Sequence, residues 1–305
     1  MRHMRHIIVV YNPNSSRYVD VEEKVLNRVK TLNGYFVEEY QVKKTVLETN
    51  VENLAKILRD GDLVISAGGD ATGVIAANGA IRSGKDVTLA VLPYGNFNDL
   101  ACTLGTKNID DVLGEKAKEV KYYPLEIYVD GEIFRYATCY VTIGMMAESV
   151  YIYDQPDMRK KLKKRFGRDV SSYTMLVKWY LNNRYKKQFL PEFRLNGEKQ
   201  DTRASDYIAM NGGAMARVMK GGKDYLDKRK FREEVERLPS LWRLAKLMCK
   251  SILIRIPGKE TDGDVLEFME PATVELQAEG EHRAFKNIKR IEIRKGDKWL
   301  KVITN

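Results

Sequence analysis

The chain has 305 residues, which allows two domains of about 100–200 residues each, and its hydrophobic content of 44% predicts packed cores. No stretch approaches the roughly 18 consecutive apolar residues that a membrane-spanning helix requires. The 52 lysines and arginines exceed the 42 aspartates and glutamates by ten, which favours anionic partners such as a nucleotide, a nucleic acid or an acidic membrane.

Strands and helices alternate over the first 120 residues. Residues 7–12 form a short β-branched run before a turn, as expected of a buried parallel strand. Apolar spacing predicts a helix over 20–32, and Thr49 or Asn50 is the candidate N-cap of the next helix. The further predicted elements are strands at 35–42, 62–67 and 87–93 and helices at 49–61 and 72–84. This alternation predicts a parallel, doubly wound α/β sheet.

The second half changes to the pattern of antiparallel strands. Two-residue turns at Asp130-Gly131 and Asn196-Gly197 lie between alternating segments, which is typical of β-hairpins. Further antiparallel strands are predicted at 272–285 and 288–304, and helical stretches near 158–184 and 228–251. The fold class is therefore α/β plus β.

The change of period also predicts the domain organisation. We expect an α/β nucleotide-binding domain over 1–122 and a β-rich acceptor domain over 123–290, with 291–305 as a candidate return to the first domain. The N-terminus lacks a signal-peptide layout, and the three cysteines are too far apart to suggest a disulfide framework or a zinc site. These features favour a cytoplasmic protein.

Three predicted strand ends carry polar and glycine-rich strings, at residues 11–16, 67–72 and 92–101. The strings are far apart in the chain. They follow parallel strands, however, and open α/β sheets bind their ligands beyond the carboxyl ends of such strands. We therefore expect the three strings to converge on one site.

The middle string has the composition of a phosphate-binding turn. Gly68 and Gly69 permit a ligand to approach the backbone closely, and the N–H groups of a following helix favour an anion. Asp70 suits a Mg²⁺ ion or the activation of a hydroxyl, and Thr72 is a candidate N-cap or phosphate contact. The alternative is an ordinary structural turn.

In combination and order, these strings resemble the diacylglycerol kinase catalytic-domain family, which includes bacterial lipid kinases and sphingosine kinases. The family motifs correspond to Asn12-Pro13-Asn14-Ser15, Gly68-Gly69-Asp70-Ala71-Thr72 and Pro93-Tyr94-Gly95-Asn96-Phe97-Asn98-Asp99-Leu100-Ala101. Weaker similarities follow at 143–148 and 278–281, so the resemblance spans most of the chain. It implies a phosphofructokinase-like nucleotide domain, a β-sandwich-type lipid domain, and ATP and Mg²⁺ used between them.

The resemblance also implies roles for individual residues. Asp70 would hold Mg²⁺ or orient the acceptor hydroxyl, and Glu281 or Glu279 would be the general base. Because alternate residues of a strand share a face, Glu279 and Glu281 are expected to project from one side, the alternative being an exposed hairpin turn. The residues expected to contact the nucleotide are Asn12, Ser15, Thr45, Gly68, Gly69, Thr72, Gly95 and Asn98.

Two segments of the second half have more than one interpretation. Asp224 and Asp227 are weak candidates for metal ligands, since the family's Asp-Gly loop is absent here and a surface loop explains them equally. The basic run at 158–168 suits an anionic membrane surface, although a solvated helix face has the same composition.

Four residues depart from the family motifs. Ala71 replaces a glycine, so its methyl group is expected to narrow the phosphate cradle. Asn96 and Phe97 replace a threonine and a small residue, and Glu279 replaces an aspartate, which extends the carboxylate by one methylene. These departures favour either a changed substrate or a relative that binds without catalysing.

The leading hypothesis is an ATP- and Mg²⁺-dependent kinase that phosphorylates the hydroxyl of a lipid such as diacylglycerol, in phospholipid biosynthesis. It would meet its lipid at the inner membrane surface, and the resemblance is compatible with a homodimer. The alternatives are an inactive relative that binds nucleotide or lipid as a regulatory module, and a kinase of a soluble acceptor similar to NAD kinases. Nucleic-acid binding comes last, because charge alone supports it.

Overall fold

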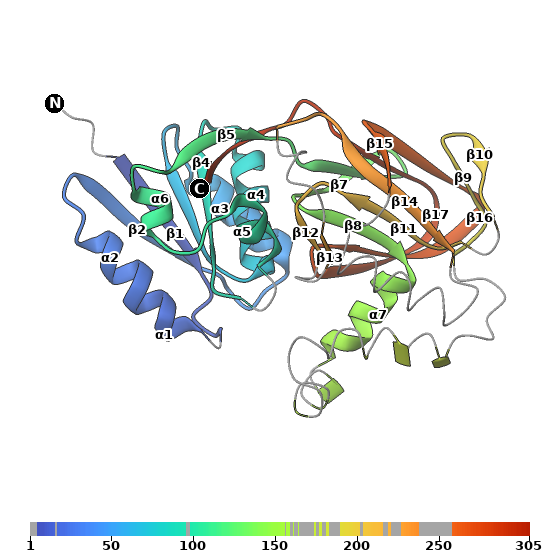
Figure 1. Ribbon diagram of the computed structural model, residues 1–305, viewed down its shortest axis with the longest axis horizontal. Coiled ribbons are helices and arrows are strands. Elements are labelled where there is room, and N and C mark those ends of the chain that lie inside the picture. Colours follow the sequence, from blue (N-terminus) through green and yellow to red (C-terminus); the bar gives the residue numbers. More distant parts are fainter. Residues whose placement is uncertain are drawn as a thin grey trace.

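The computed structural model describes residues 5–15, 17–95, 98–155, 190–201, 204–215, 219–220, 227–237 and 258–305, with isolated residues between 157 and 182. Asn96, Phe97, Asp224 and most of the basic run at 158–168 lie outside the described residues. Figure 1 shows two sheet-containing halves side by side. The first is mainly blue to cyan, with a green strand and the dark red C-terminal strand, and the second is green to red.

The first half is built on a six-stranded sheet with the order β2-β1-β3-β4-β18-β5. Its strands are β1 (Arg5–Tyr11), β2 (Tyr35–Gln41), β3 (Leu63–Gly68), β4 (Thr88–Pro93), β5 (Lys118–Tyr122) and β18 (Leu300–Thr304). All neighbours are parallel except β18 and β5, which confirms the predicted α/β class with a parallel sheet. The sequence predicts antiparallel strands over 288–304. Residues 288–294 lie in the antiparallel strand β17 (Glu281–Arg294), while β18 pairs antiparallel with β5 and in parallel with β4.

Helices cover both faces of this sheet because its strands are apolar on both sides. Along β1, Ile7 and Val9 contact one core while Ile8 and Val10 contact the other. The first face carries α1 (Tyr18–Val21), a π-helical turn η1 (Glu22–Leu26), α2 (Asn27–Lys30) and α6 (Asp110–Leu113). The second carries α3 (Leu47–Ile57), α4 (Asp70–Ser83) and α5 (Asp99–Leu104). No helix within the described ranges is long and apolar enough to cross a bilayer.

Two predicted helix starts are wrong. Helix α3 begins at Leu47, so neither Thr49 nor Asn50 is its N-cap. The buried Asn50 side chain instead accepts a hydrogen bond from the Lys43 N–H at 2.9 Å and donates to the Lys43 carbonyl at 3.0 Å. Helix α4 begins at Asp70, two residues before Thr72, because a carboxylate in the first turn interacts favourably with the helix dipole.

The second half contains a ten-stranded sheet whose main path is β15-β14-β11-β8-β16-β17-β6-β7. Its strands are β6 (Leu125–Val129), β7 (Glu132–Ala137), β8 (Tyr140–Gly144), β9 (Phe193–Leu195), β10 (Glu198–Lys199), β11 (Ala204–Met210), β14 (Phe231–Arg237), β15 (Lys259–Thr261), β16 (Gly263–Ala278) and β17 (Glu281–Arg294). A separate pair is formed by β12 (Ala214–Met215) and β13 (Met219–Lys220), and α7 (Met145–Asp154) follows β8. The strand pairings in the described part of this half are antiparallel.

The predicted helix at 228–251 is wrong where the structure describes it, because residues 231–237 form β14. Phe231 and Val235 are four residues apart, a spacing that fits one face of a helix and also one face of a strand. Pairing on both sides decides between them, since β14 lies between β11 and β15.

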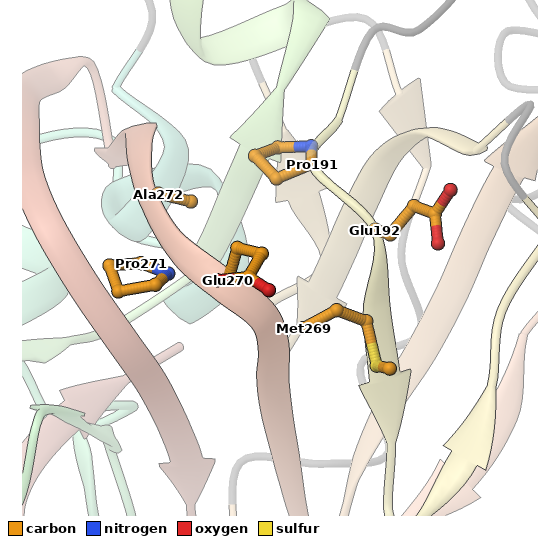
Figure 2. Close-up of a pocket in the computed structure, with 6 residues that line it drawn as sticks. All are labelled: Pro191, Glu192, Met269, Glu270, Pro271 and Ala272. Atoms are coloured by element: carbon orange, nitrogen blue, oxygen red, sulfur yellow. The ribbon is translucent and has the colours of Figure 1, made fainter.

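Strand β16 changes register between Glu267 and Ala272, around Pro271. Proline has no N–H to donate to a ladder, which explains the irregularity there. A pocket opens beside it, as Figure 2 shows, lined by Pro191, Glu192, Met269, Glu270, Pro271 and Ala272. Its lining residues Met269 to Ala272 lie seven to ten residues along the chain from Glu279, on the order of 25–30 Å of extended strand, and the pocket is therefore separate from the site described below.

Helix α4 joins the two halves, and its residues from Thr72 to Ile81 are all buried. Its Asn78 side chain accepts a hydrogen bond from the Tyr136 N–H at 3.1 Å and donates to the Tyr136 carbonyl at 2.9 Å. Tyr136 belongs to β7, the last strand of the second sheet, so a side-chain amide pairs with a free strand edge. The following Gly79 has Leu54 of α3 against it, 2.8 Å from where a Cβ would stand.

Substitution Asn78→Ala should lower the free energy of unfolding by about 1–3 kcal/mol, because it leaves the partly buried N–H and carbonyl of Tyr136 without this partner. Urea unfolding followed by circular dichroism measures the change. The control is Ser83→Ala in the last turn of the same helix, which should change stability by less than about 0.5 kcal/mol. Equal effects from the two variants would contradict a joining role for Asn78.

Candidate functional site

Four loops meet at the carboxyl edge of the parallel sheet. Asn12 follows β1, Thr45 follows β2, Gly69 follows β3 and Gly95 follows β4. These four strands are neighbours in the sheet and run in the same direction, so their following loops lie side by side. The structure thus brings the three motif strings and Thr45 to one edge.

The glycines of the second and third strings pack these loops together. A Cβ at Gly95 would overlap the Cα of Gly69, and a Cβ at Gly68 would overlap the side chain of Thr72. The Tyr94 N–H donates to the Gly68 carbonyl at 3.0 Å. The bare backbone at these positions is therefore needed for contact between loops, in addition to any approach by a ligand.

Asp70 and Asn98 fix the geometry between the loops. The Asp70 carboxylate accepts hydrogen bonds from the N–H of Asp99 at 2.8 Å and of Asn98 at 3.2 Å. Asn98 has a left-handed backbone conformation, and its side chain accepts from the Gly95 N–H at 2.6 Å. Asp70 therefore holds the start of α5 from across the sheet edge, which keeps its carboxylate in one orientation.

The remaining candidate binding residues of the first half form hydrogen bonds within or beside their own loops. The Asn12 side chain accepts from the Asn14 N–H at 2.9 Å, and the Ser15 N–H donates to the Asn12 carbonyl at 3.1 Å. Thr45 is exposed and accepts a hydrogen bond from Asn50 at 3.1 Å. Sequence analysis missed Arg17, whose guanidinium donates to the Pro93 carbonyl at 3.0 Å and links the first loop to the third.

The two candidate bases occupy different positions in the β16–β17 hairpin. Ala278 pairs with Glu281, while Glu279 and Gly280 are the turn residues, with φ of 54° and 86°. The expectation that Glu279 and Glu281 share a strand face is wrong, because alternation does not continue through a turn. Glu279 is 4% exposed and Glu281 is only partly buried.

Glu279 belongs to the second half but lines a pocket together with Asp70 of the first half. Its Oε1 accepts hydrogen bonds from the Thr138 hydroxyl and the Cys139 N–H, and its Oε2 has no hydrogen-bond partner among the described residues. One small pocket is lined by Asp70, Gly73, Val74, Asp99, Leu100, Thr138, Cys139 and Glu279. It thus combines carboxylates from both halves of the chain.

Burial raises the pKa of Glu279 to about 7, and the charge of Asp70 acts in the same direction. The hydrogen bonds from Thr138 and Cys139 oppose this shift without cancelling it. Sequence reasoning did not select Asp99, although it stands beside Asn98 in the third string. Thr138 and Cys139 belong to no motif, so only the folded chain reveals them.

The candidate metal ligand Asp227 lies elsewhere, in an exposed turn before β14. The neighbouring Lys228 carbonyl accepts a hydrogen bond from the Lys295 ammonium at 2.8 Å. Burial lowers the pKa of Lys295 to about 7, and the charge of Asp227 opposes this. Within the described ranges, no group of three His, Cys, Asp or Glu side chains is placed to hold a metal ion.

Residues 6–122 match the diacylglycerol kinase catalytic domain, and these residues span all four motif-bearing loops. The match confirms the resemblance inferred from the motifs.

Three individual proteins are also similar. The chain is 30% identical over 176 residues to a diacylglycerol kinase of Bacillus subtilis (strain 168), covering 54% of this chain and 52% of that protein. The alignment thus spans about half the length of that relative. A diacylglycerol kinase structure from Bacillus anthracis str. Sterne aligns with a TM-score of 0.69 at 15% identity, covering 100% of this chain and 98% of that one. A second structure from that organism gives 0.70 at 16%, covering 100% and 99%. At these identities the structures establish a shared fold.

Substitution Glu279→Gln should change how stability depends on pH. The Glu279 pKa is about 7 in the folded chain and near 4.5 when unfolded, so the folded state binds more protons between these values. Stability from this group is full below pH 4.5 and is lost as the pH rises to 7. The variant has no carboxyl group to titrate at this position. Between pH 4.5 and pH 7, the free energy of unfolding of the variant minus that of the parent should therefore increase by roughly 3 kcal/mol.

Urea unfolding at pH 5 and pH 8 measures this difference. The control is Glu132→Gln, which replaces an exposed carboxylate on β7. If Glu279→Gln and the parent protein respond to pH in parallel, the Glu279 carboxylate is not held in the buried environment described here.

Proposed function

We propose that the chain is an ATP- and Mg²⁺-dependent kinase that transfers a phosphoryl group to the hydroxyl of a lipid such as diacylglycerol. The observation that carries this proposal is the pocket in which Asp70 of the nucleotide half and Glu279 of the second half lie together. The family of residues 6–122 and the name of the Bacillus subtilis relative support a lipid as the acceptor.

In this proposal the first half is a phosphofructokinase-like nucleotide domain and the second a β-sandwich-type lipid domain. Phosphoryl transfer needs mainly positioning and charge neutralisation, with a base to take the acceptor proton. The loops at the carboxyl edge would hold the nucleotide through Asn12, Ser15, Thr45, Gly68, Gly69, Thr72, Gly95 and Asn98. Glu279 is the better placed base of the two glutamates, because its unpartnered Oε2 belongs to a residue lining the same pocket as Asp70.

The side chains around the pocket fit a Mg²⁺ ion that enters with the nucleotide. Mg²⁺ commonly takes one or two protein carboxylates and completes its shell with phosphate oxygens and water. Asp70 and Asp99 both line the pocket, so either can serve as such a ligand without a protein cage. The ion would supply neutralisation of the phosphate charge. Asp227 is separated from these carboxylates in the fold, and its proposed role as a ligand has no support from its contacts.

The departures from the family motifs leave the pocket intact where the structure describes them. Ala71 is exposed in the first turn of α4, has no positive φ and does not line the pocket. Its methyl group therefore does not narrow the space beside Asp70. Glu279 occupies the position of the family's aspartate, and its Oε1 accepts hydrogen bonds from both Thr138 and Cys139. These observations favour a catalyst over a relative that only binds.

Incubation with γ-labelled ATP, Mg²⁺ and a total lipid extract should yield a labelled lipid with the parent protein. Asp70→Asn should reduce the labelling at least a hundredfold, because it removes a charge that neutralises or orients the reacting groups. The matched control is Asp111→Asn, since the Asp111 carboxylate also accepts two backbone N–H groups, from Lys107 and Asn108, outside the site.

Three outcomes separate the alternatives. Labelled lipid with both the parent protein and Asp70→Asn would remove Asp70 from the mechanism. Thermal stabilisation by Mg·ATP without a labelled lipid would favour a binding module. A labelled water-soluble product would favour a kinase of a soluble acceptor.

A further inference from the structure

The β16–β17 turn places a glutamate at a position that disfavours glutamate. Glu279 and Gly280 are the two turn residues, and both have positive φ, 54° and 86°. Two-residue turns of this kind favour asparagine, aspartate or glycine, because other side chains are crowded by the backbone at positive φ. Glu279 is also 4% exposed, so its carboxylate is removed from water. A residue that destabilises the fold in two ways indicates that its side chain has a function.

The connection between β7 and β8 holds one oxygen of this carboxylate. Thr138 and Cys139 form the connection, and the Thr138 hydroxyl and the Cys139 N–H both donate to Glu279 Oε1. The Oε2 atom is buried and has no hydrogen-bond partner among the described residues. Two donors on Oε1 restrict the rotation of the carboxyl group, so Oε2 keeps one orientation. All three residues line the pocket that Asp70 also lines.

Asn211, directly after β11, fixes this connection in turn. Its N–H donates to the Cys139 carbonyl at 2.7 Å, and its Nδ2 donates to the Thr138 carbonyl at 2.8 Å and to the Tyr123 carbonyl at 2.9 Å. Asn211, Thr138 and Cys139 are each at most 2% exposed. Because both carbonyls of the connection are held by buried bonds, its two donors to Glu279 have a fixed position.

We propose that Thr138 is a positioning residue for phosphoryl transfer, whose hydroxyl holds Glu279 together with the Cys139 N–H so that Oε2 receives the proton of the acceptor hydroxyl. This inference rests on the proposed function and names the groups that orient its base. In the transfer step the acceptor oxygen forms a bond to the terminal phosphorus of ATP. The bond from that phosphorus to the bridging oxygen breaks, ADP leaves with the electron pair, and the acceptor proton passes to Oε2.

Thr138 acts through Glu279 and not on the nucleotide. It follows β7 in the second half, whereas the loops proposed to hold the nucleotide follow β1, β2, β3 and β4 in the first. The Cys139 thiol is not an alternative base, because burial raises its pKa well above its usual range and keeps it protonated. The rate of the transfer step should therefore depend on the Thr138 hydroxyl, and nucleotide binding should not.

The test compares Thr138→Val, which removes the hydroxyl and keeps the branched shape, with Thr138→Ser, which keeps the hydroxyl. We expect Thr138→Val to lower kcat for lipid labelling about tenfold to a hundredfold, because a general base that is out of position loses most of its contribution. The KM for Mg·ATP should stay within about twofold of the parent value. Thr138→Ser should restore kcat to within about threefold of the parent, because its hydroxyl can still donate to Oε1.

Thr142→Val is the matched control. Thr142 is an equally buried threonine on β8, and its hydroxyl donates to Gln277 Oε1 at 2.9 Å instead of to Glu279. The variant should lose stability and keep kcat within about twofold of the parent, measured well below the thermal midpoint of each protein.

A second comparison tests whether Thr138 acts through Glu279. In the Glu279→Gln background the base is absent, so adding Thr138→Val should lower the residual kcat by less than about twofold. Independent effects would multiply, and a further loss of about tenfold in the double variant would overturn the inference.

The outcomes separate this inference from the proposed function. If the parent protein phosphorylates a lipid and Thr138→Val does so with the parent kcat, the role of Thr138 is overturned while the lipid kinase stands. A loss of kcat in Thr138→Ser equal to that in Thr138→Val would assign the defect to packing and would also overturn it. If the parent protein binds Mg·ATP but phosphorylates no lipid, both proposals are overturned.

Discussion

The arrangement of the two halves depends on the burial of helix α4 between them. Its N-terminus presents Asp70 at the sheet edge, and Asn78 pairs with the free edge of β7 two turns later. Eight residues of helix span about 12 Å, and a helix packed on every side is a rigid spacer. One element therefore sets the distance between the nucleotide half and the strands that carry Glu279. Disturbing α4 would change the site as well as the core.

The electrostatics of the site follow from placing carboxylates where water is scarce. Among the described residues no cation bonds to Glu279, and two neutral donors, the Thr138 hydroxyl and the Cys139 N–H, bond to one of its oxygens. A buried carboxylate in this environment is more basic than usual, a property suited to accepting a proton near neutral pH. Asp70 lies within electrostatic reach, and its charge opposes the ionisation of Glu279.

Much of the first half could be predicted from local patterns. β-branched runs, helical spacing and turns at regular intervals identified the parallel sheet, and parallel strands bring their carboxyl ends together. The starts of α3 and α4 were missed because Asn50 and Thr72 resemble caps but are used inside their helices. In the second half, the four-residue spacing of Phe231 and Val235 fits one face of a helix and also one face of a strand. Only the pairing of β14 with β11 and β15 shows that the segment is a strand.

The candidate site was predictable only in its motif-bearing part. Asp70 and the glycines stand in recognisable strings, whereas Thr138 and Cys139 reach the site through hydrogen bonds to Glu279, 141 and 140 residues away in the chain. The positions of Glu279 and Glu281 were misjudged because a turn interrupts strand alternation. Whether Glu279 is buried is a tertiary property, and no spacing in the sequence encodes it.

The chain crosses between the halves twice, since it leaves the six-stranded sheet after β5 and returns to it through β18. Residues 123–124 form one crossing and residues 295–299 the other, so the second half is an insertion with two covalent attachments. Two attachment points define a line, and rotation of one half against the other is easiest about that line. Opening of the site would therefore be a rotation of the second half about this one axis. A swing of this kind would carry the β16–β17 turn toward or away from Asp70 along one reproducible arc.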